Sequence, residues 1–139
     1  GTSEHQTGLA VDLCCEATGY DNNYDFIYTD EYAWLLVNAH RYGWVMRYPK
    51  HKSDLTGYNF EPWHFRYVGV EIATYIMENG LSLEEFTAES QAALQDFVSR
   101  GGDIQKQTDA EFRMLNTPPE STVLDIYGED GDAEVTLSF

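Results

Sequence analysis

The stretch Ser3-Glu4-His5-Gln6-Thr7-Gly8-Leu9-Ala10-Val11-Asp12 decides the fold, because its second half alternates apolar and small residues. This alternation predicts a β-strand from about Gly8, with the aliphatic side chains on one face, since successive strand residues point to opposite sides. Asp12 shares the other face with glycine and alanine, which leaves room for another group beside its carboxylate. His5 precedes the strand and can fold back over that space.

A second polar group follows much later in the chain, at Phe60-Glu61-Pro62-Trp63-His64-Phe65. His5, Asp12 and His64 together would supply two nitrogen ligands and one oxygen ligand to a metal ion. Three such ligands leave the fourth position of a tetrahedral zinc ion open to water, which is typical of catalytic rather than structural zinc. The two stretches therefore predict a catalytic zinc site.

Glu61 is a carboxylate that this ligand set does not use. On a regular strand Glu61 and His64 would point to opposite faces. Pro62 cannot donate a hydrogen bond to a sheet, so we expect a bulge or a strand entry that lets both side chains reach one cavity. A glutamate beside a zinc-activated water is the general base that metal-assisted hydrolysis needs.

The two strings resemble the signature motifs of the zinc D-alanyl-D-alanine carboxypeptidases of bacterial cell walls. Those enzymes are relatives of the vancomycin-resistance peptidases within the hedgehog-type peptidase fold. A looser resemblance extends from residue 1 to about residue 86 and includes Arg47-Tyr48-Pro49-Lys50 and Thr56-Gly57-Tyr58. The resemblance implies an α+β fold, in which a small antiparallel sheet carries the zinc site and helices flank it.

The resemblance also implies roles for single residues. It makes His5, Asp12 and His64 the zinc ligands and Glu61 the catalytic base. Ser3 resembles a family position near the bound substrate. Arg47 and Arg66 are the nearby cations that we expect as further substrate contacts. An extracytoplasmic place, at a bacterial cell wall or cell surface, is implied by the same resemblance.

The leading hypothesis for function is a zinc carboxypeptidase that removes a C-terminal D-alanine from peptidoglycan stem peptides. A wall endopeptidase or a dipeptidase of the same fold would use the same zinc residues. A non-enzymatic alternative is a zinc-binding module without turnover. The presence of Glu61 argues against that alternative, because a purely structural metal needs no additional carboxylate.

Composition supports a globular chain and excludes two classes of partner. Of the 139 residues, 42% are hydrophobic and 14% aromatic, which is typical of a folded domain. The chain contains no run of about 18 apolar residues, so we expect no membrane span. Residues 67–139 carry three Lys/Arg against fifteen Asp/Glu, and the net charge of the chain is -16. This charge argues against nucleic acid as a partner, because binding it requires clustered cations.

The position of the first motif suggests that a segment precedes it in the family. Related enzymes carry there an arginine that helps to hold the substrate. We therefore expect residues 1–139 alone to bind zinc yet to hydrolyse weakly, because orientation of the substrate is a large share of catalysis.

The two cysteines, Cys14 and Cys15, are adjacent, so the chain has no disulfide framework. Both are expected to be buried small apolar residues. Further along, Thr29 or Asp30 is expected to cap a helix that reaches about Tyr42 and ends at Gly43. Its expected apolar stripe contains Ala33, Trp34, Leu36 and Val37.

The length of 139 residues favours one domain, which we divide into a peptidase-like core at 1–86 and an acidic extension at 87–139. The sequence leaves open whether the extension packs on the core, forms a small appendage or is a tail. In the core we expect strands at 44–48 and 59–67, joined by a loop at 50–57, and a helix at 69–79. Ser82 and Glu85 form a capping-box pattern over a short turn. The extension is expected to contain a helix at 89–100, a brief helical turn at 108–115 and a hairpin of 123–127 with 134–139.

Overall fold

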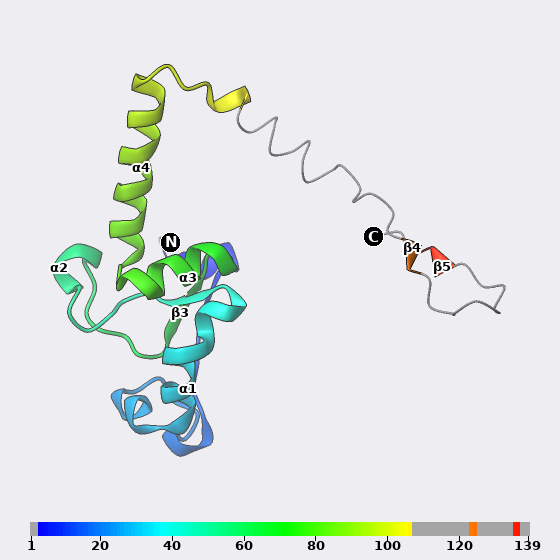
Figure 1. Ribbon diagram of the computed structural model, residues 1–139. Helices are drawn as coiled ribbons and strands as arrows, with labels where there is room; N and C mark the ends of the chain where they lie inside the picture. The colour runs from blue at the N-terminus through cyan, green and yellow to red at the C-terminus, as the bar shows by residue number, and fades with distance from the viewer. Residues whose placement is uncertain (1–2, 107–122, 125–134, 137–139) are drawn as a thin grey trace, which may run out of the picture. The chain divides into compact units, whose positions relative to one another are not determined.

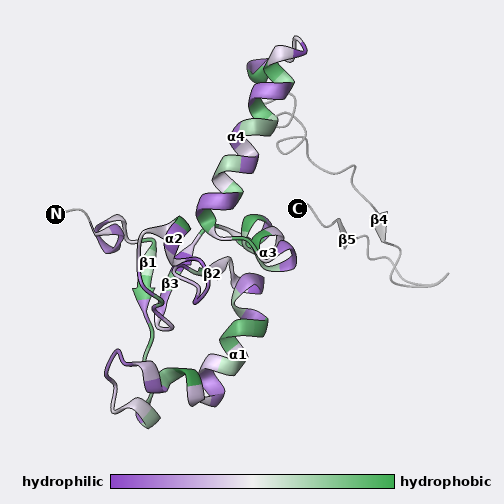
Figure 2. Ribbon diagram, turned by 90° about the vertical axis from the view of Figure 1, so that its left-hand side faces the viewer, coloured by the Kyte–Doolittle hydropathy of each residue, from purple (hydrophilic) through white to green (hydrophobic). Residues whose placement is uncertain are grey.

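A small antiparallel sheet brings the two sequence motifs together. The structure, a computed structural model, describes residues 3–106, 123–124 and 135–136. The middle strand is β3 (His64–Tyr67), which pairs with β1 (Ala10–Asp12) on one side and with β2 (Trp44–Met46) on the other. Figure 2 shows the three strands side by side. The expected α+β class with a small antiparallel sheet is confirmed.

Helices make up most of the remaining described structure (Figure 1). In chain order, the α-helices and the 3-10 helices (η) are η1 (Glu4–Thr7), η2 (Glu16–Thr18), η3 (Tyr24–Tyr28), α1 (Asp30–Asn38), η4 (Ala39–Tyr42), α2 (Ser53–Thr56), α3 (Val70–Asn79) and α4 (Leu83–Ser99). The chain divides into two compact units, Gly1–Ala93 and Leu94–Phe139, and α4 begins in the first and ends in the second.

The helix expected after Thr29 forms with both of its predicted caps. The Thr29 hydroxyl oxygen accepts a hydrogen bond from the Tyr32 amide at 3.2 Å, and Gly43 ends the helical stretch at a φ of 83°. Between these caps the helix is not continuous, because α1 gives way to η4 at Ala39. The loop expected at 50–57 also differs, since it contains the short helix α2.

The hydrophobic core of Gly1–Ala93 lies between β2 and α3. It consists of buried residues and the partly buried residues around them, namely Val45, Ala73 and Ile76, with Val68, Ile72, Leu83 and Phe86. Phe65 in the middle strand is 1% exposed. The aromatic face of that strand thus enters the interior at this position, as its alternation with His64 predicts.

Two burial predictions are wrong. Within α1, all of which the structure describes, no residue is buried, and Trp34, Leu36 and Val37 are at least half exposed. Hydrophobic colours accordingly appear on α1 in Figure 2. Cys14 is exposed and only Cys15 is buried, because the alternation continues past the end of β1 and puts Cys14 on the side of the exposed Asp12.

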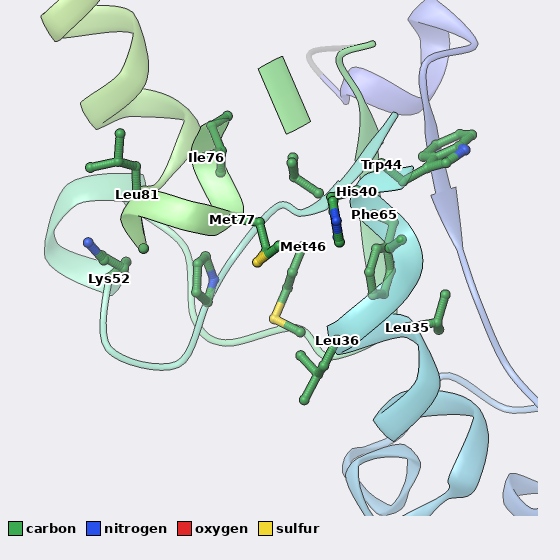
Figure 3. A pocket seen from close by; sticks show the side chains of 14 residues that line it. Leu35, Leu36, His40, Trp44, Met46, Lys52, Phe65, Ile76, Met77 and Leu81 are labelled. Carbon is green, nitrogen blue, oxygen red and sulfur yellow. The ribbon is translucent and has the colours of Figure 1, made fainter. Parts of the chain in front are cut away.

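An apolar cavity of about 280 Å³ lies next to this core. Figure 3 shows side chains from the α1–η4 stretch, β2 and α3 converging on it, with Phe65 at one side and Lys52 at its edge. The side chain of His40 lines this cavity, and its Nδ1 is buried without a hydrogen-bond partner among the described residues. His40 is therefore not among the residues gathered around His64.

The capping box at Ser82 and Glu85 is confirmed. The Ser82 amide donates to Glu85 Oε2 at 2.7 Å, and the Glu85 amide donates to Ser82 Oγ at 3.2 Å. The box opens one helix of 17 residues rather than a short turn and a second helix. Gly101, at a φ of 85°, follows its end as expected.

Part of the expected C-terminal hairpin falls within the described residues. There, β4 (Val123–Leu124) pairs with β5 (Val135–Thr136) in antiparallel register. The helical turn expected at 108–115 and the other residues of the hairpin lie outside the described residues.

Candidate metal centre

Three side chains from the two motifs meet at one point. Ligand atoms of His5, Asp12 and His64 all lie within 4.8 Å of one another. Asp12 Oδ1 is 3.3 Å from His5 Nε2 and 3.4 Å from His64 Nδ1. Zinc bonds of about 2.0–2.1 Å in a tetrahedral arrangement place neighbouring ligand atoms about 3.3 Å apart. Both distances from Asp12 Oδ1 therefore match the spacing of neighbouring ligand atoms around a tetrahedral zinc ion.

Strand register places Asp12 beside His64. The two residues are direct partners in the β1–β3 pair, and side chains of directly opposed residues in an antiparallel pair lie on the same face. Asp12 is the last residue of its strand and His64 the first of the other, so the pair lies at the end of the sheet. The sequence patterns of the two strands thus determine this half of the cluster.

The turn around Gly8 returns His5 to the same point. Helix η1 ends at Gly8, which has a φ of 72° and whose amide donates to the His5 carbonyl at 3.1 Å. Glycine adopts this left-handed conformation without the steric cost that a Cβ brings. The ring centroids of His5 and His64 are 4.6 Å apart. The tight turn at Gly8 therefore determines the position of His5 beside Asp12 and His64.

Glu61 reaches the cluster because the strand begins after Pro62. The His64 amide donates to the Glu61 carbonyl at 3.2 Å, so Glu61 to His64 forms a turn rather than a regular strand. Glu61 Oε2 lies 3.3 Å from His64 Nδ1. Of the two expected arrangements, the strand entry is the one that the structure shows. Pro62 itself is buried.

The contacts at His64 Nδ1 fit a cation between the side chains. Carboxylates of Asp12 and Glu61 approach this nitrogen at 3.4 and 3.3 Å, both longer than a normal hydrogen bond. His64 is 5% exposed, while the side chains of His5 and Asp12 are 38% and 30% exposed. The cluster is thus anchored on a buried imidazole and open to solvent at its other two members.

Glu4 occupies the opposite edge of the His64 ring, a contact that the sequence analysis missed. Its Oε1 lies 2.8 Å from His64 Nε2, while its Oε2 accepts from Arg47 Nε at 3.2 Å and Arg66 Nη1 at 3.0 Å. Burial alone would raise the pKa of Glu4, but the His64 hydrogen bond and the two arginines outweigh it and hold that pKa below its usual range. Glu4 is therefore a carboxylate.

The two arginines expected near substrate are both engaged by Glu4. Arg47 also pairs with Glu84 at 2.6 Å through Nη2, and its Nη1 is buried without a partner among the described residues. Burial acts to lower the pKa of Arg47, but Glu84 and Glu4 together raise it above its ordinary value. The Arg47 guanidinium thus remains charged.

An open cavity of about 490 Å³ surrounds the cluster. Its lining contains Ser3 and Arg47, whereas Arg66 is not among the lining residues. Aromatic rings form one wall: Tyr48 stacks on Tyr58 with centroids 4.5 Å apart. Trp63 also lines the cavity. Tyr48 and Tyr58 fall in the stretches of looser resemblance, which was the available signal for them.

Asn22 is a second residue that the sequence analysis missed. Its Nδ2 donates to Asp12 Oδ2 at 3.0 Å, so that Asp12 Oδ1 remains turned toward the two histidines. Asn22 lies in a polar stretch at residues 19–25, and nothing in the composition of that stretch distinguishes Asn22 from its neighbours. A contact made by a loop residue of this kind can be recognised only in the folded structure.

Comparisons with known proteins identify a family and several relatives. The family model for D-alanyl-D-alanine carboxypeptidase (VanY) matches residues 1–70, about half of the chain. The putative carboxypeptidase YodJ of Bacillus subtilis is 49% identical over 86 residues, which cover 62% of this chain and 32% of that protein. The chain thus spans about a third of the length of this curated relative.

Two solved structures share the fold. The LdcB LD-carboxypeptidase, described with the molecular basis of its peptidoglycan recognition, is 48% identical with a TM-score of 0.61 over 63% of this chain and 41% of its own. A mutant of the vancomycin-resistance D,D-pentapeptidase VanY in complex with Zn(II) is 46% identical with a TM-score of 0.52, over 63% and 46%. The chain belongs to the VanY family of D-alanyl-D-alanine carboxypeptidases.

Proposed function

We propose that this chain is a zinc-dependent carboxypeptidase that releases a C-terminal D-alanine from peptidoglycan stem peptides. The observation that carries the proposal is the meeting of His5, Asp12 and His64 at one point, where Asp12 Oδ1 lies 3.3 Å from His5 Nε2 and 3.4 Å from His64 Nδ1. The Glu61 carboxylate lies beside the same His64 nitrogen. Family membership and the Zn(II) complex of one relative support the choice of metal. His5 Nε2, Asp12 Oδ1 and His64 Nδ1 are the proposed ligand atoms.

When bound, zinc would supply a Lewis acid that activates water and polarises the peptide carbonyl. Glu61 would accept the proton of the water at its carboxylate and then deliver it to the leaving amine. We assign Glu61 the role of base rather than of a fourth ligand. Its Oε2 lies 3.3 Å from His64 Nδ1, close enough to the proposed ligand atoms to reach a water bound among them. The exposed side of His5 and Asp12 is where a peptide would enter.

Substrate contacts remain part of the proposal. Ser3 and Arg47 line the cavity at the cluster, and Arg47 carries the positive charge that a C-terminal carboxylate would meet. Arg66 would act more indirectly, since its guanidinium donates to Glu4. The aromatic wall of Tyr48 and Tyr58 would limit the size of the residue beside the scissile bond.

Location and domain roles are proposed on the same basis. Peptidoglycan peptides as substrate imply an extracytoplasmic place of action at the cell wall or cell surface. Among the described residues, no helix combines the length and the apolar character that crossing a membrane requires. We assign residues 1–86 to the peptidase and residues 87–139 to an acidic extension without a catalytic motif.

The LdcB relative suggests a second specificity for the same site. LdcB is an LD-carboxypeptidase, and its sequence identity to this chain is as high as that of the D,D-pentapeptidase VanY. The test therefore uses two peptides, one ending in D-alanyl-D-alanine and one ending in an L-residue followed by D-alanine. Faster release from the first supports D,D-specificity, and faster release from the second replaces it with L,D-specificity.

The decisive variant is Glu61→Gln, which preserves shape but cannot accept a proton. We expect it to keep its zinc while the rate of D-alanine release falls by about 100-fold or more. Released D-alanine and bound zinc are measured on the same preparations. Glu78→Gln, at an exposed position of α3, is the matched control for the lost charge. Wild-type turnover by Glu61→Gln at equal zinc content would remove Glu61 from the mechanism.

A further inference from the structure

We propose that Glu4 is a positioning residue that fixes the tautomer and the orientation of the His64 ring for metal binding. The proposal rests on the proposed zinc site and adds to it a residue outside the ligand set. Glu4 belongs to the first motif, and its carboxylate contacts His64 Nε2, the ring nitrogen that the proposed ligand set does not use. It would act through His64.

The two nitrogens of His64 face different surroundings. Nε2 lies 2.8 Å from Glu4 Oε1, a normal hydrogen-bond distance, whereas Nδ1 faces Asp12 and Glu61 at longer distances. A carboxylate can only accept a hydrogen bond, so the neutral ring must carry its proton on Nε2. The lone pair of Nδ1 is then directed at the space shared with His5 and Asp12, where a metal ion requires it.

The Glu4 carboxylate is itself held in place. Its second oxygen accepts charge-assisted hydrogen bonds from Arg47 Nε and Arg66 Nη1, at 3.2 and 3.0 Å. Arg47 is held in turn by Glu84 at 2.6 Å. The side chains of Glu4 and Arg47 are only 16% and 14% exposed. A ring bonded to so constrained an acceptor cannot rotate without breaking this hydrogen bond, and the buried ring nitrogen would then lose its partner, which is costly.

Helix η1 supplies residues on both sides of the His64 ring. Glu4 and His5 are consecutive in this helix, yet Glu4 meets the Nε2 edge while the His5 ring lies 4.6 Å away at the metal side. One short turn therefore contributes a proposed ligand and the group that orients another ligand. Outer groups of this kind typically change metal affinity by about 10–100-fold when they are removed.

A purely structural role for Glu4, as a neutraliser of two arginines, gives a different expectation. It would change the stability of the fold but not the proton position on His64. The test therefore measures the ring ¹⁵N shifts of His64 in the metal-free chain, the zinc dissociation constant by competition with a chelator, and the thermal midpoint. The variants are Glu4→Gln and Glu4→Ala, with Glu78→Gln as the charge-matched control.

We expect the Nε2-protonated tautomer in the wild type and a mixture of tautomers in Glu4→Ala. Zinc affinity should fall by about 10–100-fold in Glu4→Ala and by less in Glu4→Gln, whose amide oxygen can still accept from Nε2. The Glu78→Gln variant should match the wild type. These results together would establish the positioning role.

Each contrary result would reject a different part of the proposal. Zinc affinity within two-fold of wild type in a folded Glu4→Ala variant rejects the positioning role and leaves the zinc site standing. Absence of zinc binding by the wild type rejects the proposed function itself. If the Glu4 variants do not fold, the wild-type tautomer decides alone, because a proton on Nδ1 is incompatible with the proposal.

Discussion

The two faces of β3 differ in how completely their side chains are partnered. On one face His64 and Arg66 belong to a continuous set of contacts with Glu4, Asp12 and Glu61. On the other face Phe65 is buried but borders the 280 Å³ apolar cavity of Figure 3. The polar face is thus specified by direct bonds, while the apolar face is loosely filled.

The two faces show that a short sequence motif can specify polar contacts but not apolar burial. Hydrogen bonds and ion pairs are directional, so Glu4 and His64 determine each other's positions across sixty residues of sequence separation. Apolar burial is not directional and requires a covering layer. Helix α1 has apolar side chains, but among the described residues it meets no layer that buries them.

The largest effect is expected from Phe65→Ala, which breaks the apolar face at its most buried ring. Removing a buried phenylalanine side chain typically costs about 3–5 kcal/mol of unfolding free energy. Urea unfolding, followed by circular dichroism, would measure this loss in the metal-free chain. Phe65→Leu is the graded control and should cost less. A loss below about 1 kcal/mol in Phe65→Ala would show that the neighbouring cavity lets the site collapse.

His64→Ala tests the polar face. We expect zinc affinity to fall by more than about 100-fold, because even outer-shell substitutions cost about 10–100-fold and this one removes a proposed ligand. Zinc retained after dialysis is measured by elemental analysis. His51→Ala, at an exposed histidine that is not a member of the cluster, is the control. Full zinc occupancy in His64→Ala would show that the ligand assignment is incorrect.

Sequence reasoning found the residues that meet at His64 because they belong to two compact motifs. His5, Asp12, Glu61 and His64 were all named from their spacing and chemistry, and the structure places them together. Their roles as ligands and base stay predictions. Glu4 was overlooked because its partners, Arg47 and Arg66, are distant in sequence, and only the strand register brings them together.

Sequence reasoning failed where burial depends on a partner element. The 3.6-residue periodicity predicted α1 with its Thr29 cap, since capping is a local interaction. It also predicted that Trp34 and Val37 would be buried, which they are not. Periodicity shows which side of a helix is apolar. Whether that side is buried depends on another element of the fold that packs against it.

The ion pair between Glu85 and Lys52 lies away from β3 and gives a third measure of how much one polar contact stabilises the fold. Hydrogen bonds from Lys52 Nζ, at 2.6 Å, and from the Ser82 amide hold the pKa of Glu85 below its usual value of 4.5. The unfolded chain therefore binds this proton more readily. The stabilisation is present above about pH 4.5 and is lost as the pH falls through the lower folded-state pKa.

Glu85→Gln should accordingly melt below the wild type at about pH 7, and the difference should shrink at about pH 3. Thermal melts of metal-free protein, followed by circular dichroism, measure both differences. Because this pair is partly exposed, its effect should be much smaller than that of Phe65→Ala. A difference that grows toward acid pH would contradict the assigned direction of the pKa shift.

The smallest effect is expected from Val37→Ser, which tests whether the apolar side of α1 is uncovered in solution. Val37 is 62% exposed, and serine has a similar helix propensity, so the unfolding free energy should change by no more than about 0.5 kcal/mol. The same substitution at Val45, which is 6% exposed in the core beside α3, should cost at least about 1.5 kcal/mol. Urea midpoints of the two variants, measured at several protein concentrations, make the comparison. Equal losses at the two positions would mean that α1 is covered, and a loss at Val37 that grows with protein concentration would identify a second copy of the chain as the cover.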